Sequence, residues 1–237
     1  MSIIGQPDSY QDMLKRIFYV SVITGIGCTA GIALASPSFK AFLDSWSLEA
    51  DLGPLKSVKA LYVLIPLGIA LISRVFLLHD KLQKIFGLRK LFEEKYILQS
   101  LAKNVELSLD GQQKYWMGVN RNDLLYQAFY PYASFKDPVI DRQLVYTAAD
   151  RWGWFWAAME SSFILLISSI IFFALSAWLG LAIAFGIALL LILFMFYQWT
   201  NLIESAEAQV KAIGLDAQRQ TEIVRIFQKL CVEPKKN

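Results

Sequence analysis

The sequence predicts an all-α integral membrane protein with four transmembrane helices, arranged as two hairpins with a helical cytosolic module between them. Hydrophobic residues make up 56% of the 237 residues and charged residues 18%, against roughly 45–50% and about 25% in soluble domains. Ser161 to Asn201 contains no charged side chain, which is about twice the roughly 20 residues that one crossing needs. The basic residues also gather on one side of the resulting topology.

The rare residue types exclude several functions. We expect the two cysteines, Cys28 and Cys231, to be free thiols rather than a disulfide framework. The single histidine, His79, cannot build a multi-histidine metal site. The net charge of +3 gives no specific nucleic-acid signal. We therefore predict a protein without a cofactor or a metal.

Residues 1–78 are predicted to form an N-terminal region and the first transmembrane hairpin. Ile17 to Ser36 is uncharged and long enough to cross the bilayer. Ala33-Leu34-Ala35 is typical of a signal-peptidase site, but the apolar run exceeds the roughly 7–15 residues of a signal-peptide core, so we interpret it as a membrane helix. Pro37 ends this helix, and the aromatic residues beyond it predict a short interfacial helix. Ala60 to Leu78 is the predicted second crossing.

One face of the first predicted helix carries a small residue at every fourth position. Gly27, Gly31 and Ala35 recur at this spacing and therefore share a face. Small residues let helices approach closely in lipid, so we predict that this face packs against another helix. Self-association of the protein through the same face is a further interpretation.

Residues 79–150 are predicted to form the cytosolic module. Apolar residues at helical spacing from His79 to Leu107 predict a long amphipathic helix, with Gly87 as its weak point. A shorter helix is predicted over Leu124–Tyr130, and Asp137-Pro138 is typical of the start of the next one. The basic face of the long helix is expected to contact anionic lipid headgroups or a partner protein. That face comprises Lys81, Lys84, Arg89, Lys90 and Lys95.

Aromatic residues are dense in the same module. They are typical of a small packed core or of a contact with another subunit, and a box for an aromatic ligand is the remaining interpretation. If the module binds a cytosolic protein, these side chains are the expected docking surface. The candidates are Tyr126, Phe129, Tyr130, Tyr132 and Phe135.

Residues 151–204 are predicted to form the second transmembrane hairpin. Its helices are expected near Trp156–Leu175 and Leu181–Thr200, with the turn at Ser176–Gly180. The outer turn is short and carries no charge, which leaves little room for a binding site on the outer side of the membrane.

Residues 205–237 are predicted to form a cytosolic C-terminal helix and tail. Gly214 is typical of a helix end, and Asp216 of the start of a last amphipathic helix. Four crossings place both termini and the module on the same side of the membrane. That side holds most of the lysines and arginines, so the positive-inside rule makes it cytoplasmic.

Two ionisable residues are predicted at membrane depth, where such groups are costly and mark functional sites. Arg74 and Glu160 both fall about one turn inside the cytoplasmic end of a predicted crossing. They could form an ion pair or line an aqueous pore. Alternatively, Arg74 reaches the headgroups and Glu160 lies at a wet helix end.

The sequence contains no catalytic motif, so we predict that the protein is not an enzyme. Two functions remain. The first is a homo-oligomeric gated pore, because one protomer with four crossings is too small to enclose a conduit. The second is a non-conducting membrane anchor or sensor that scaffolds a soluble partner.

The layout of these segments resembles that of the small multi-crossing membrane effectors of bacterial antiviral defence operons. The likeness is carried by Ile17–Ser36, Ala60–Leu78 and Trp156–Thr200, with the basic helix His79–Leu107 beneath the membrane. It concerns layout and not a motif, so it assigns no individual residue. The resemblance implies a multi-pass protein of the bacterial inner membrane that permeabilises the membrane when a cytosolic partner, encoded nearby, signals infection.

Overall fold

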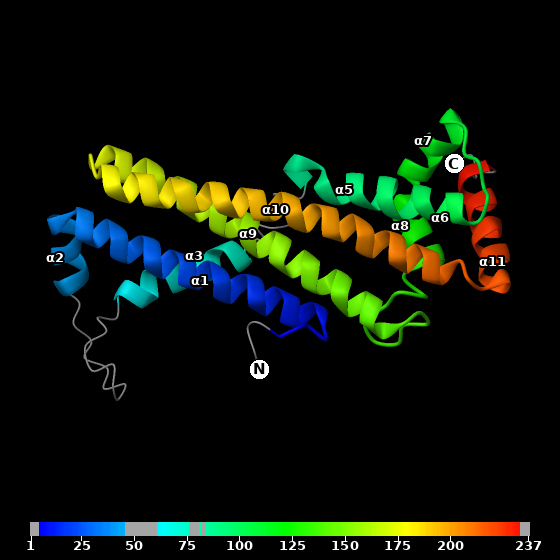
Figure 1. The fold of residues 1–237 in the computed structure, drawn as a ribbon, viewed down its shortest axis with the longest axis horizontal. Helices are drawn as coiled ribbons and strands as arrows, with labels where there is room; N and C mark the ends of the chain where they lie inside the picture. The colour runs from blue at the N-terminus through cyan, green and yellow to red at the C-terminus, as the bar shows by residue number, and fades with distance from the viewer. Residues whose placement is uncertain (1–4, 46–60, 76–80, 82–83, 233–237) are drawn as a thin grey trace. The chain divides into compact units, whose positions relative to one another are not determined.

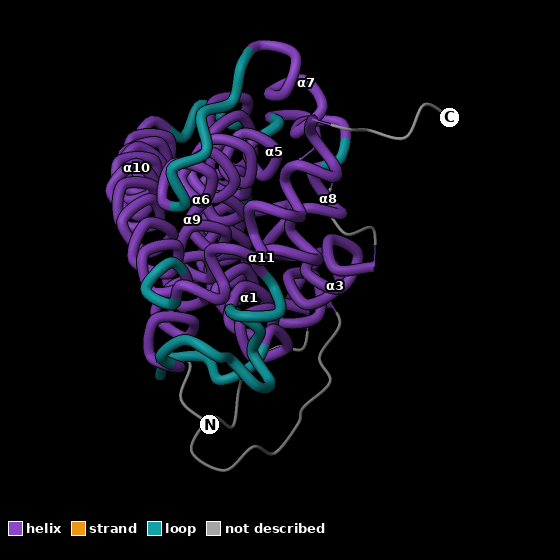
Figure 2. Tube along the Cα trace, turned by 90° about the vertical axis from the view of Figure 1, so that its right-hand side faces the viewer, coloured by secondary structure: helices purple, strands orange, loops and turns teal. Residues whose placement is uncertain are grey.

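A computed structural model describes residues 5–45, 61–75, 81 and 84–232 of the chain. Every regular element in these ranges is a helix (Figures 1 and 2), which confirms the all-α prediction. The chain divides into two compact units. Unit 1 comprises Met1–Gly5, Met13–Lys81 and Gly153–Gln198. Unit 2 comprises Gln6–Asp12, Leu82–Trp152 and Trp199–Asn237.

The N-terminal part of unit 1 contains α1 (Tyr10–Ala35), α2 (Pro37–Ser45) and α3 (Leu61–Val75). The break between α1 and α2 falls at Pro37, as predicted. The Ser36 hydroxyl accepts a hydrogen bond from the backbone N–H of Phe39 at 3.3 Å. Ser36 therefore caps α2 while Pro37 occupies its first turn, where the missing N–H of proline costs nothing.

Three helices in the described ranges are long and apolar enough to cross a membrane, namely α1, α9 (Arg142–Ala174) and α10 (Trp178–Ile213). The predicted second crossing coincides with α3, which has 15 residues. The apolar stretch of α3 is Leu61–Leu71, shorter than the roughly 20 residues that span a bilayer. The end of that predicted crossing, residues 76–78, lies outside the described residues.

The second predicted hairpin coincides with α9 and α10, which Leu175–Ala177 connect. The turn comes about two residues earlier than predicted. Ser176 adopts a positive φ of 54°, and Ala177 N–H bonds to the Phe172 carbonyl at 2.9 Å. This is the geometry that normally ends a helix at a glycine. The α9 helix also continues unbroken through Gly153.

The centre of unit 1 is an apolar cluster shared by α1, α9 and α10. Phe172 of α9 lies between two glycines, and a Cβ built on Gly31 of α1 would lie 3.0 Å from its Cζ. A Cβ on Gly180 of α10 would lie 2.6 Å from its Cδ1. The absence of side chains at these two positions lets three helices close around one ring. The other buried members are Cys28, Leu165, Ala184 and Ala188.

Unit 2 is built from short helices that pack around the ends of α9 and α10 belonging to the same unit. Three of these helices continue into a π-helical turn, the local widening that often occurs at functional sites. The elements are α5 (Leu88–Phe92), η2 (Glu93–Leu98), α6 (Gln99–Asn104), α7 (Gly111–Val119), α8 (Arg121–Leu124), η3 (Leu125–Phe129), α11 (Ala217–Phe227) and η4 (Gln228–Val232).

The long amphipathic helix predicted from His79 to Leu107 is interrupted at Gly87, which separates helical residues 84–86 from a helix that begins at Leu88. Gly87 precedes it with φ 61° and ψ 13°, a left-handed conformation that glycine adopts without strain. The predicted weak point is therefore a true helix start, and the continuous helix runs only to Asn104.

The helix start predicted at Asp137-Pro138 is wrong, because α9 begins at Arg142. Backbone N–H groups of Val139 and Ile140 bond to the Tyr132 carbonyl at 2.9 and 3.2 Å. These bonds hold the segment in a loop and outweigh the local signal. Asp141 instead accepts a hydrogen bond from the Gln143 N–H at 2.9 Å at the actual start.

The helix end predicted at Gly214 and the helix start predicted at Asp216 are confirmed. The α10 helix ends at Ile213, and the Asp216 carboxylate accepts a hydrogen bond from the Arg219 N–H at 2.9 Å, capping α11. Ile223 and Phe227 are fully buried on one face of α11. Together with Ile213, they contribute to the core of unit 2.

Candidate functional site in unit 1

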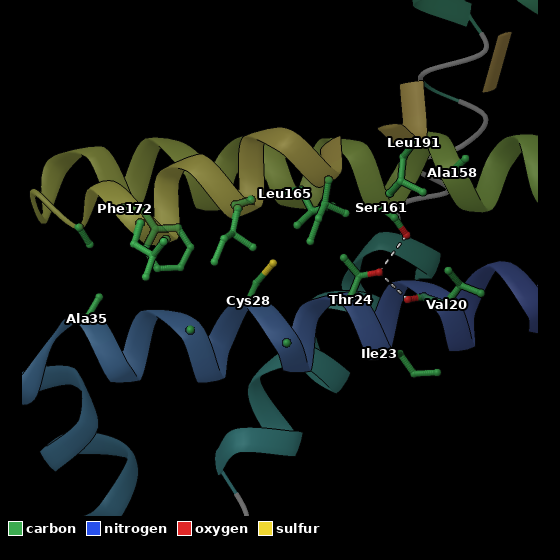
Figure 3. A pocket seen from close by; sticks show the side chains of 18 of the residues that line it. Val20, Ile23, Thr24, Cys28, Ala35, Ala158, Ser161, Leu165, Phe172 and Leu191 are labelled. Carbon is green, nitrogen blue, oxygen red and sulfur yellow. Dashed lines mark hydrogen bonds between the residues drawn. The ribbon is translucent and has the colours of Figure 1, made fainter. Parts of the chain in front are cut away.

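Polar side chains from α1 and α9 meet inside the apolar part of unit 1. The Ser21 hydroxyl donates a hydrogen bond to the Glu160 carboxyl over 2.9 Å. Three residues further along α1 and one residue further along α9, the hydroxyls of Thr24 and Ser161 lie 3.0 Å apart (Figure 3). Two polar pairs therefore line up along the same helix–helix contact.

Glu160 is the central residue of this site. Its side chain is enclosed, with 7% of the residue exposed, and it lies in a helix long enough to span a membrane. An acidic side chain inside a span is costly, by up to about 2.5–3.5 kcal/mol at its centre on insertion scales, so its presence calls for a function or a partner. Ser21 supplies one hydrogen bond to it.

Arg74, the second ionisable residue predicted at membrane depth, lies in α3. It is exposed in the last turn of α3, and its guanidinium carbon lies 5.8 Å from the centre of the Phe18 ring. The ion pairs among the described residues include none between Arg74 and Glu160. Their pairing stays a prediction.

Sequence reasoning missed a buried cation in the same unit. Arg16 is buried, with its guanidinium carbon 4.9 Å from the centre of the Trp154 ring, and it donates a hydrogen bond to the Gly5 carbonyl. In the sequence Arg16 simply ends a polar segment. The hydroxyl pair could have been suspected, because Ser21 and Thr24 are three residues apart and share a face of α1.

A largely apolar groove of about 970 Å³ runs along α1, α9 and α10. Thr24 and Ser161 are polar residues on its wall, and Trp154 and Trp178 are among its lining residues. Figure 3 shows the Thr24 and Ser161 hydroxyls pointing toward each other beside Val20. The polar contact between α1 and α9 thus opens onto the groove.

The predicted small-residue face lies along this groove, which Gly27, Gly31 and Ala35 all line. Gly31 and Ala35 pack toward the cluster around Phe172, which bears out close packing for that part of the face. A Cβ on Gly27 would meet nothing within 4 Å. A close approach that sequence reasoning missed occurs at Gly25, where a Cβ would lie 3.0 Å from Cβ of Pro66.

The predicted basic face is exposed at all five positions, of which Lys81 belongs to unit 1 and the others to unit 2. In unit 2, Arg89 Nε lies 2.7 Å from Glu93 Oε1, and Lys90 Nζ lies 3.9 Å from Glu94 Oε1. Lys95 lies over its neighbour Tyr96, with Nζ 5.3 Å from the ring centre. Lys84 is the fifth residue of the predicted basic face and is exposed.

The five docking candidates divide by burial. Tyr126 is 76% exposed and Tyr130 is also exposed. Phe129 and Tyr132 are buried within unit 2, and Phe135 is half-buried with its ring centre 6.3 Å from that of Tyr146. Tyr126 and Tyr130 are therefore the two candidates whose side chains are exposed to a partner. Burial and the hydrogen bond to Glu222 raise the pKa of Tyr132 to about 12.

The chemistry open to the site in unit 1 is exchange of a proton or of a small cation. A carboxyl oxygen and hydroxyl oxygens are hard ligands and proton carriers, and intramembrane carboxylates recur in such pathways. In the described ranges, no three histidine, cysteine, aspartate or glutamate side chains gather as a metal site.

The helices and the site define a membrane protein in which three long apolar helices accompany a unit of short helices. The chain matches the YmfE protein family over residues 9–228, and it belongs to that family. That match covers both units almost completely. No curated protein and no solved structure matches the chain.

Proposed function

We propose that this protein is a homo-oligomeric, gated pore of the bacterial inner membrane that lets small cations or protons cross. Unit 1 is the conducting part, and unit 2 is the cytosolic part that controls it. Both termini lie in the cytoplasm, as the distribution of basic residues predicts. In this proposal α3 belongs to a fourth crossing.

The observation that carries this proposal is the enclosed carboxyl of Glu160 inside a span-length helix. Ser21 bonds to it at 2.9 Å, and Thr24 and Ser161, the residue after Glu160, provide a second polar pair. A row of oxygen ligands inside an apolar unit is a costly arrangement for helix packing alone, because apolar side chains pack equally well in lipid.

Oligomerisation supplies the rest of the conduit. One protomer provides one wall of polar groups, and several copies are needed to surround a path. The groove along α1 leaves Gly27 without a close neighbour within the protomer, as expected for a surface that another helix approaches.

The proposal is tested in cells by replacing the carboxyl alone. Induced wild-type protein is expected to depolarise the inner membrane, and Glu160→Gln to reduce that depolarisation at least tenfold at equal membrane abundance. A potential-sensitive dye reports the result. Ser162→Ala is the matched control, because Ser162 is a buried α9 hydroxyl that bonds only to its own helix, at the Ala158 carbonyl. Equal depolarisation by Glu160→Gln and Ser162→Ala would contradict the proposal.

An antiviral role is part of this proposal and rests on the resemblance in layout. Cells that carry the gene with its neighbours are expected to form fewer plaques on infection than cells that carry Glu160→Gln in the same operon. Equal plating on the two strains would remove the antiviral role and leave the pore proposal intact.

The second candidate function is a non-conducting anchor that scaffolds a soluble protein. The exposure of Tyr126 favours it, because a large aromatic side chain left in water is typical of a docking surface. A tight soluble partner that is lost on Tyr126→Ala, with no depolarisation by the wild-type protein, would support the anchor in place of the pore.

A further inference from the structure

Glu93 is a buried carboxylate in unit 2 that the proposed conduction does not use. Glu93 directly follows α5, the helix that Gly87 precedes, and 5% of the residue is exposed. The sequence marks it only as one of two adjacent glutamates. Its surroundings are defined by two arginines from different helices.

Each oxygen of the Glu93 carboxylate faces one guanidinium. Arg89, four residues earlier on the same helix, places Nε 2.7 Å from Oε1. Arg121, the first residue of α8, places Nε 3.1 Å from Oε2. The second contact is an ion pair without the alignment of a hydrogen bond, since both of its atoms lack a hydrogen-bond partner. One carboxylate thus holds two arginines.

Among the residues that the structure describes, the charges of this cluster do not balance. Arg89 and Arg121 contribute two positive charges and Glu93 one negative charge. The nearby Glu94 faces Lys90 instead, at 3.9 Å. The second guanidinium therefore carries a positive charge that must be solvated or bound to an anion.

The excess charge is accessible. The Arg89 side chain is 56% exposed and that of Arg121 23%. Tyr130 lies beside them, and its neutral phenol is a hydrogen-bond donor. The two arginines are also fixed at Nε by Glu93, which lowers the conformational entropy that binding would cost.

We propose that Arg89, Arg121 and Tyr130, held in place by Glu93, form a binding site for a phosphate-bearing anion. Guanidinium groups match phosphate oxygens with paired N–H donors, and a phenol adds a further donor. The phosphate belongs either to a soluble molecule or to a lipid headgroup. The site stands independently of the proposed pore, because it involves unit 2 alone.

The test is direct binding of inorganic pyrophosphate to the full-length protein in nanodiscs of zwitterionic lipid, measured by titration calorimetry at constant ionic strength. The wild type is expected to bind, and Arg89→Gln to bind at least tenfold more weakly. Lys90→Gln is the matched control, because it removes the same charge from the adjacent residue, which is 64% exposed and faces Glu94 instead of Glu93. Should Arg89→Gln fail to fold, Arg89→Lys keeps the charge, loses the paired donors and is expected to bind more weakly too.

A second arm uses nanodiscs that contain phosphatidylglycerol. Competition of this lipid with pyrophosphate in the wild type, and not in Arg89→Gln, would identify a lipid headgroup as the source. Undiminished pyrophosphate binding in the presence of the lipid would identify a soluble ligand. Absence of binding by the wild type in both nanodiscs, or equal weakening by Arg89→Gln and Lys90→Gln, would overturn the proposal.

Discussion

Phe172 determines, at the scale of single residues, how closely the apolar helices of unit 1 pack. Its ring fills the space that side chains at Gly31 and Gly180 would occupy. Interiors are packed so densely that even one added methyl group is felt. The glycines of these helices therefore differ sharply in how well they tolerate substitution by alanine, although the sequence makes all of them equally plausible packing positions.

Gly180→Ala is expected to lower the free energy of unfolding by about 1–3 kcal/mol, the usual cost of overpacking. The new Cβ would lie 2.6 Å from Cδ1 of Phe172. Gly186→Ala on the same helix is the control, because its Cβ would meet nothing within 4 Å and should cause no loss. Unfolding in mixed detergent measures both variants. Recovery by Phe172→Leu in the Gly180→Ala background would confirm the cause, and equal stability of the two alanine variants would refute it.

The contacts of single residues in the site could not be predicted from the sequence. The acidic residue at membrane depth was predicted, but its partner was not, since Ser21 and Glu160 are 139 residues apart. No local pattern specifies which faces of two helices meet. The same limit applies to the arginines around Glu93, because only the folded unit brings Arg121 to that carboxylate.

At the scale of elements, several helices of this chain begin or end at a short-range sequence signal. Ser36-Pro37, Gly87 and Asp216 all act within one turn, so the sequence predicts them well. Asp137-Pro138 carries an equally good local signal and fails, because the following backbone N–H groups bond to Tyr132 instead. Local signals succeed when no tertiary hydrogen bond competes with them.

Asp216→Ala tests the local start of α11. Loss of the cap is expected to destabilise unit 2 by about 0.5–2 kcal/mol, because the Arg219 N–H loses its acceptor. Thr221→Ala is the control, since that exposed hydroxyl bonds only to the Ala217 carbonyl of its own helix. Chemical denaturation followed by helix content measures both. A loss as large in Thr221→Ala would show that the cap is not the cause.

The whole molecule combines a unit with the composition of a membrane bundle and a unit with a mixed polar surface. Sequence composition predicted this division, because long uncharged runs separate from charged amphipathic ones. The predicted fourth crossing is the weakest part of this prediction. Pro66 and Arg74 both fall in α3, and its apolar stretch ends at Leu71. That stretch is shorter than the roughly 20 residues that span a bilayer.

The α9 and α10 helices each contribute residues to both units. In the proposed gating, these continuous helices would carry a signal from unit 2 to the candidate site.

Conduction by the purified protein is the central claim, and ion flux in liposomes tests it most directly. Wild-type protein reconstituted alone is expected to dissipate an imposed proton or potassium gradient, with Glu160→Gln at least tenfold slower at equal protein content. Such a result would place conduction in this chain and at this carboxyl. Liposomes that hold their gradient as well with the wild type as without protein would contradict the account, as would equal flux through Glu160→Gln.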